Sequence, residues 1–216
     1  MKVAVVRRNA GELASLTKEL GAASRAYACD ATDEGAVQKL FPAVASDLGA
    51  PVLVVYNAAG SIRKGILETT AAEFERCWKN ICMGGFLVGR EAARAMLGNS
   101  MERRHRGTIV FTGATASVRG SAGFAAFAGA KHALRALAQS MARELGPQGI
   151  HVAHVVIDGA IDTRFIADNF PERYALKDKG GILSPDAIAE NYWNLHCQHK
   201  SAWTHELDLR PWIEPW

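Results

Sequence analysis

Short apolar runs alternate along the chain with longer segments in which apolar residues recur every three or four positions. Runs of the first kind predict buried β-strands, and segments of the second kind predict amphipathic helices. Strands are expected at Val3–Val6, Arg25–Cys29, Val52–Tyr56, Thr108–Thr112, Ile150–Ile157 and Glu206–Leu209. Strands that alternate with helices in this way are typical of a parallel sheet joined by crossover helices. The pattern therefore predicts an α/β fold.

Residues that favour helix starts fall between these strands. Asn9-Ala10-Gly11-Glu12 is similar to a capping box and precedes a periodic apolar segment. Further helices are expected from Asp33 to about Leu48, from Thr70 toward Met96, over Phe124–Leu145, and after Ser184-Pro185-Asp186. Residues Gly98–Gly107 are expected to form a charged loop. With no repeat or linker in view, residues 1–216 are expected to form a single domain.

Composition narrows the class of protein. A chain of 216 residues can bury the core of one ordinary domain. The net charge of +3 comes from interspersed basic and acidic residues, which gives no reason to expect a nucleic-acid partner. No apolar run is long enough to span a membrane, and the four cysteines are scattered, as is usual in a reducing compartment. We therefore expect a soluble, cytoplasmic protein without a membrane partner.

Four motifs follow expected strands or open an expected helix. They are Asn57-Ala58-Ala59-Gly60, Thr112-Gly113-Ala114, Phe127-Ala128-Gly129-Ala130-Lys131 and Asp158-Gly159-Ala160-Ile161-Asp162-Thr163. In this order they resemble the short-chain dehydrogenase/reductase family, and the resemblance covers nearly the whole chain. It implies a Rossmann-like, doubly wound parallel sheet in three layers.

The resemblance lacks its usual opening, a central first strand with a Gly-rich turn and helix that hold the cofactor pyrophosphate. Two explanations stay open. The first is a start inside the coding region, with Met1 an ordinary core methionine. The second is a natural deletion, in which Val3–Val6 moves into the central position and Asn9-Ala10-Gly11 serves as a poor substitute turn. In either case something must fill the sheet, because unpaired buried backbone groups cost roughly 1–3 kcal/mol each.

The resemblance also implies a catalytic set of Tyr, Lys, Ser and Asn, of which one member is in place. Lys131 matches the family lysine, but Phe127 stands at the Tyr position and Ala114 at the Ser position. Ile81 stands at the Asn position, and Asn80 is one residue early, which on a regular helix turns its amide by about 100°. Because Phe127 lacks the hydroxyl of a tyrosine, Lys131 could instead be a solvated helix residue.

Cofactor contacts are implied at the ends of the expected strands. The family resemblance places NADP(H) against Arg7, Arg8, Asp30, Ala31, Asn57, Ala58, Lys131, Gly159, Ile161 and Thr163. A basic residue after the first strand of this chain favours NADP over NAD, although two surface arginines are common. Asp30 and Thr163 could instead be helix N-caps. Ala59 replaces a family glycine, and we expect cofactor binding to be weak without the Gly-rich turn.

Two functions are compatible with these residues. One is an NADP-dependent oxidoreductase that acts on a small carbonyl or alcohol, with weak or absent activity in this form. The other is a non-catalytic relative that binds a nucleotide or another subunit. A homodimer or homotetramer is expected through the helices that begin near Thr70 and Phe124. No metal is expected, because His196, Cys197, His199 and His205 fit no standard zinc spacing.

Overall fold

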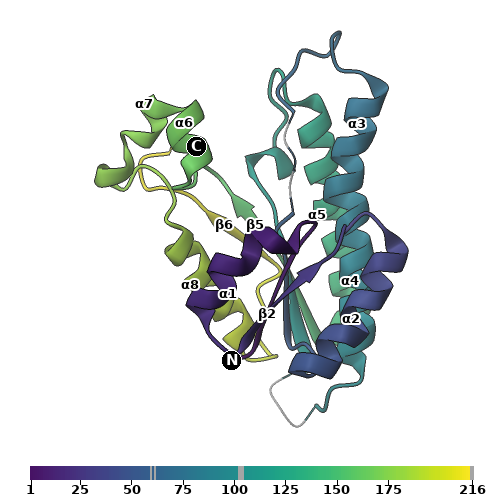
Figure 1. The fold of residues 1–216 in the computed structure, drawn as a ribbon. Helices are drawn as coiled ribbons and strands as arrows, with labels where there is room; N and C mark the ends of the chain where they lie inside the picture. The colour runs from purple at the N-terminus through teal and green to yellow at the C-terminus, as the bar shows by residue number, and fades with distance from the viewer. Residues whose placement is uncertain (59, 61, 102–104, 215–216) are drawn as a thin grey trace.

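The computed structural model describes residues 1–58, 60, 62–101 and 105–214. All of its strand pairs are parallel, and they form two sheets (Figure 1). The smaller sheet contains β1 (Val3–Arg7) and β2 (Ser24–Ala28). The larger one has the order β3-β4-β5-β6, with β3 at Leu53–Tyr56, β4 at Gly107–Thr112, β5 at Ile150–Ile157 and β6 at Glu206–Leu209. The predicted parallel α/β fold is confirmed.

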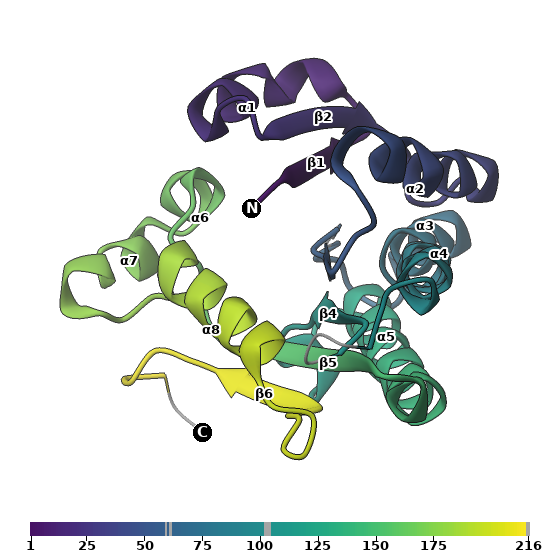
Figure 2. The same ribbon diagram turned by 90° about the horizontal axis from the view of Figure 1, so that it is seen from below.

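Helices cover both faces of the sheets. Figure 2 shows α2, α3, α4 and α5 on one side and α1 and α8 on the other, which gives three layers. The helices on the first side are α2 (Glu34–Leu48), α3 (Ala71–Trp78), α4 (Gly84–Leu97) and α5 (Ala125–Leu145). The remaining helices are α1 (Ala14–Leu20), α6 (Arg164–Asn169), α7 (Pro171–Tyr174) and α8 (Pro185–Cys197).

Local sequence signals explain most helix starts. Thr70 and Glu73 form a complete capping box before α3, and Ser184 accepts a hydrogen bond from the Ala187 amide before α8. At the first helix, the expected capping residue begins a 3₁₀ turn rather than the α-helix itself. Asn9 caps a 3₁₀ turn at Ala10–Leu13, and α1 follows it. The short helices α6 and α7 were not predicted.

The core is divided by the larger sheet. On one side, residues such as Phe111, Ile109 and Leu134 pack with α2, α4 and α5. On the other, Val155 and Ile157 pack with Tyr192 and Leu195 of α8. Every residue of β5 is buried, as expected for a central strand covered on both faces.

The sheet is interrupted between β1 and β3. Within the described residues, β1 pairs with β2 alone and β3 pairs with β4 alone. The helical layer is nevertheless continuous, because α2 packs against α4 and Arg90 of α4 forms an ion pair of 2.5 Å with Glu34 of α2. The alternative in which Val3–Val6 moves beside the larger sheet is therefore wrong. The strand pairs with β2 instead.

Candidate functional site

The residues selected from the sequence lie along one edge of the fold, where the parallel strands end. In open parallel sheets this is the edge at which ligands bind. Two groups of polar side chains occupy it. One follows β1 and β2, and the other follows β4 and β5.

Lys131 is the central residue of the second group. Helix α5 buries its side chain to 2% exposure, and its Nζ donates a 2.7 Å hydrogen bond to the Thr112 carbonyl at the end of β4. Burial lowers the pKa of this amine to about 8. The reading of Lys131 as a solvated helix residue is therefore wrong. Its ammonium is held inside the protein by the strand that it covers.

Phe127 lies beside this lysine, one helical turn earlier. Its ring centroid is 5.7 Å from Lys131 Nζ, within the range of a cation–π contact. The ring is half-buried and packs against the main core. An aromatic ring thus occupies the position expected for the phenol, and it has no proton to transfer.

The hydroxyls near Ala114 are bonded within the protein. Ser117 Oγ accepts a 3.1 Å hydrogen bond from the Ala114 amide, and Thr115 Oγ1 donates a 2.5 Å hydrogen bond to Asp158 Oδ1. The other carboxylate oxygen of Asp158 lies 2.8 Å from Arg210 Nη2. The Thr115–Asp158–Arg210 network was missed from the sequence. Its one signal was Asp158 itself, an acidic residue directly after the expected strand Ile150–Ile157.

Ile81 and Asn80 lie where α3 meets α4. Residues Lys79–Met83 form a π-helical turn, so the rotation of a regular helix does not apply there. Ile81 is fully buried in the core. The Asn80 amide nitrogen is only 3.4 Å from where a Cβ on Gly60 would stand, so this amide faces the loop after β3. The expectation that the Asn80 amide points away from the strand ends is therefore wrong, because it assumed a regular helix at this position.

The first group lies after β1 and β2 and is more exposed. Arg7 forms a 2.8 Å ion pair with Glu12, and both side chains are more than half exposed. Asp30 accepts hydrogen bonds from the amide and hydroxyl of Thr32, which lower its pKa, with Arg8 contributing further. Asp30 is not the helix N-cap that was its alternative reading, because Asp33 caps α2. Ala31 packs against the main core.

The remaining selected residues follow β3 and β5. Asn57 and Ala58 are exposed, and Ala59 lies outside the described residues. Gly159 has a φ of +151°, and a Cβ there would lie 2.8 Å from Pro211 Cδ, so only glycine fits this turn. Ile161 forms a bridge with Leu183. Thr163 caps α6 by accepting a hydrogen bond from the Ile166 amide, as its alternative reading proposed.

These residues fit a dinucleotide at its adenosine end but not at the ribose that the family lysine usually holds. Arg7 and Arg8 are exposed, so their guanidinium groups could reach a phosphate at the adenosine end of the dinucleotide. Lys131 does not fit the usual role of holding the ribose, since its ammonium is turned to Thr112 and buried. In the described part of the chain, no cluster of three His, Cys, Asp or Glu side chains could hold a metal ion. Nor is any described helix long and apolar enough to cross a membrane.

Comparisons with known proteins agree with this architecture. The sequence profile described as short chain dehydrogenase matches residues 1–173. A short-chain dehydrogenase structure from Rhodopseudomonas palustris is 40% identical, with a TM-score of 0.79 over 98% of this chain and 87% of that one. The chain is 35% identical to a protein of Xanthobacter autotrophicus named inactive 2-(S)-hydroxypropyl-CoM dehydrogenase 2, over 88% of this chain and 84% of the relative.

A third relative is longer than this chain. The 3-oxoacyl-[acyl-carrier-protein] reductase MabA of Mycobacterium bovis is 32% identical over 75% of this chain, and the matched part spans 60% of the reductase. Together with the parallel three-layer fold, the profile match shows that the chain belongs to the short-chain dehydrogenase/reductase family of oxidoreductases. Members of this family generally use NAD(P).

Proposed function

We propose that this chain is a short-chain dehydrogenase/reductase whose activity on small carbonyls or alcohols is weak or absent in this form. The nucleotide we propose is NADP(H), held weakly at the adenosine end by Arg7, Arg8 and Asp30. The exposure of the two arginines supports this choice, because their guanidinium groups can approach a ribose phosphate.

The observation that carries the proposal is the environment of Lys131. Carbonyl reduction needs a proton donor at the carbonyl oxygen when hydride arrives, and the donor must lie within hydrogen-bond reach. Beside Lys131 stands the ring of Phe127, and the neighbouring hydroxyls of Thr115 and Ser117 are bonded to protein groups. The lysine itself donates to Thr112. The polar groups that follow β4 are thus hydrogen-bonded within the protein.

Steady-state turnover tests this proposal. We expect NADPH oxidation, followed at 340 nm with a panel of ketones and quinones, to stay well below about 1 s⁻¹, a rate ordinary for enzymes. Phe127→Tyr alone should raise it by less than about tenfold, because members of a catalytic unit act non-additively and Ala114 remains. Ala114→Ser is the matched single variant. Turnover of about 1 s⁻¹ or more by the parent chain would show that another group supplies the proton.

Calorimetry tests the nucleotide part separately. We expect NADPH to bind with a Kd weaker than about 1 μM, which corresponds to roughly −8 kcal/mol, because the described residues offer contacts at one end only. Arg8→Ala should weaken NADPH binding more than NADH binding, since only NADPH carries the ribose phosphate. Equal losses for the two nucleotides would contradict the assignment of Arg8.

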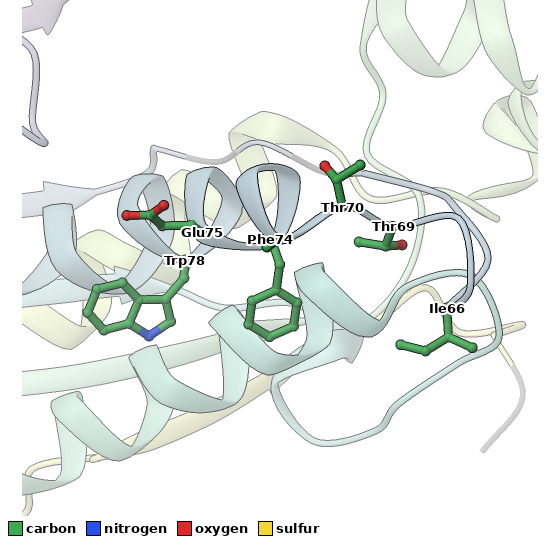
Figure 3. A pocket seen from close by; sticks show the side chains of 7 residues that line it. Ile66, Thr69, Thr70, Phe74, Glu75 and Trp78 are labelled. Carbon is green, nitrogen blue, oxygen red and sulfur yellow. The ribbon is translucent and has the colours of Figure 1, made fainter.

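A subunit-interaction role is the second candidate, and an exposed apolar surface favours it. A shallow hollow of about 590 Å³ on α3 is lined mainly by apolar parts of Ile66, Phe74, Ala71 and Trp78 (Figure 3). Phe74 is 44% exposed and lies over Gly129 of α5, where a Cβ would be 3.4 Å from its ring. We propose that a second copy of the chain covers this surface, as homodimers and homotetramers of the family would require.

Sedimentation equilibrium at tens of micromolar tests the self-association. The parent chain should sediment as a dimer or larger. Phe74→Glu should shift it toward monomer, because charged residues are rare at the centre of stable interfaces, where burying them is unfavourable. Phe165→Glu is the matched control, since Phe165 is 60% exposed on the distant α6. A parent that stays monomeric rules the proposal out.

A further inference from the structure

A cluster of imidazole and indole rings lies at the amino ends of the strands, opposite the edge that carries Lys131. Its members come from the segment before β4, the start of β5, the last turn of α8 and the connection 198–205 that leads to β6: His105, His151, His196, Trp203 and His205. The Trp203 ring stacks on His151 at 4.9 Å and meets His105 edge-on at 5.9 Å. His105 and His151 are 8% and 1% exposed. We call these five residues the ring cluster.

The backbone fixes the tautomer of three of these imidazoles. Each ring places one nitrogen against a backbone carbonyl oxygen, at 2.8 Å for His105 and His151 and at 3.2 Å for His205. A carbonyl oxygen can only accept, so that nitrogen must carry the hydrogen, and in a neutral ring the other nitrogen carries none. The tautomers that follow are Nε2–H for His105 and His151 and Nδ1–H for His205.

The opposite nitrogens of these three rings are buried, and none has a hydrogen-bond partner among the residues that the structure describes. Protonating one of the rings would place a positive charge in this interior, and burial disfavours the charged form. Burial accordingly lowers the pKa of His151 from its ordinary value of 6.5. Backbone carbonyls oppose this shift, and the neighbouring imidazoles of His105 and His205 add to it.

The elements that meet at the ring cluster offer such a charge no free carboxylate within the described residues. The acidic residue next to the cluster is Glu206, and its carboxylate is bonded to Arg135 and His154 on the α5 side of the sheet. The other titratable and charged groups on these elements and on the segment before β4 are Arg106, His196, Cys197, His199 and Lys200. None of these groups carries a negative charge at neutral pH, so the cluster is suited to neutral rings.

The neutral rings fasten the end of α8 and the connection after it to the sheet. His105 Nε2 donates to the His196 carbonyl in the last turn of α8. His151 Nε2 donates to the Thr204 carbonyl in the connection, on which Trp203 also lies. Each of these bonds joins a residue of or next to a strand to a segment outside the larger sheet.

Helix α8 extends this attachment toward the candidate site. The His196 ring lies 2.9 Å from the Thr108 hydroxyl at the start of β4. One helical turn earlier, the Tyr192 hydroxyl lies 2.8 Å from that of Thr112 at the end of β4. The Thr112 carbonyl is the acceptor for Lys131. The ring cluster and the candidate site are therefore connected through one face of α8.

We propose that the ring cluster is a pH-sensitive clasp, which holds the last turn of α8 and residues 198–205 while its rings are neutral and releases them when the rings are protonated. In the released form the imidazoles reach water and bind protons more readily. The released form therefore gains population as the pH falls below about 6.5, the ordinary pKa of histidine. The proposal concerns a different part of the molecule from the proposed activity and does not depend on turnover or on nucleotide binding.

Amide hydrogen exchange at several pH values tests the clasp. Between about pH 7.5 and about pH 5, exchange in residues 198–205 and the last turn of α8 should rise by at least about tenfold beyond the intrinsic change, because uptake of one proton over one pH unit changes an equilibrium tenfold. Strand β4 is the internal control and should keep its protection. Unchanged exchange in residues 198–205, or loss of protection in β4 at the same pH, would overturn the proposal.

A neutral variant tests the rings themselves. His151→Gln keeps an N–H group that can donate to the Thr204 carbonyl but has no titrating ring, so it should lose most of the acid effect. The matched control is His199→Gln, at an exposed imidazole bonded to Ser201, and it should behave like the parent. The same acid effect in His151→Gln as in the parent would contradict the clasp.

Nitrogen-15 NMR of the imidazoles tests the clasp without any substitution, and so also covers the case in which His151→Gln does not fold. At pH 7 we expect Nε2–H tautomers at His105 and His151 and the Nδ1–H tautomer at His205, as their carbonyl partners require. A charged His151 ring at this pH, or the opposite tautomers, would overturn the proposal.

Discussion

At the carboxyl ends of the strands, the polar side chains after β1 and β2 and those after β4 and β5 lie in opposite environments. After β1 and β2, Arg7 and Glu12 pair in solvent, and Arg8 is exposed. After β4 and β5, Lys131 is 2% exposed and Asp158 is 8% exposed, and both are bonded to protein groups. Charges of the first kind are exposed to solvent, whereas charges of the second kind are part of the packed interior.

The residues beside each group account for this difference. A phenol beside Lys131 would compete for its ammonium, whereas the Phe127 ring leaves it to the Thr112 carbonyl. Asp158 likewise holds Thr115 and Arg210 together. Substitutions after β4 and β5 should therefore change stability, and substitutions after β1 should change it little.

The largest effect is expected in the pH dependence contributed by Lys131. Its pKa is lowered from 10.5 to about 8 in the folded protein, so the unfolded chain binds more protons between these values and stability rises with pH across the window. The shift corresponds to about 3 kcal/mol. Relative to Lys131→Met, the parent should therefore gain about 3 kcal/mol of unfolding free energy between pH 7 and pH 10.5.

Urea unfolding at several pH values measures this difference. Comparing the parent with the variant removes the contributions of Tyr56 and Cys82, whose burial raises their pKa in both proteins. Lys79→Met is the control, because the Lys79 side chain is 54% exposed and pairs with Glu75 on the surface. Parallel stability curves for the parent and Lys131→Met would contradict the buried position of the amine.

A smaller effect is expected at Asp158. Asp158→Asn removes the negative charge from Arg210 and weakens the acceptor for Thr115 Oγ1, and leaving largely buried polar groups poorly paired costs roughly 1–3 kcal/mol. Chemical unfolding at pH 7 should show a loss of about 2 kcal/mol. The control Asp168→Asn, whose partner Arg164 is 93% exposed, should change stability by less than about 0.5 kcal/mol. Equal losses would make the two ion pairs equivalent.

Patterns with a local cause were predictable from the sequence. Glu206–Leu209 was expected as a final strand, and the structure has the same bounds. The capping box at Thr70 and the cap at Ser184 also lie where they were expected. In each case the signal lies within a few residues, since strand periodicity and capping depend on neighbours along the chain.

The features that could not be predicted from the sequence depend on contacts between segments that are distant along the chain. The Thr115–Asp158–Arg210 network joins residues that follow three different strands, so no local pattern announces it. The position of Asn80 depends on a π-helical turn, which is rare and changes the register that a regular helix would have. The burial of Lys131 likewise needs β4 beneath α5. Helix periodicity alone could not separate it from a surface lysine.

The smallest effect is expected at Arg7. Its ion pair with Glu12 is short, at 2.8 Å, but the two side chains are 61% and 51% exposed, so water and salt screen the attraction. In a double-mutant cycle with Arg7→Ala and Glu12→Ala, the coupling energy should lie between 0 and about 0.5 kcal/mol and should shrink further at 1 M salt. A coupling above about 1 kcal/mol would mean that this end of the strand edge is also built for stability. The contrast with Lys131 and Asp158 would then lose its basis, because both halves of the edge would hold their charges in the same way.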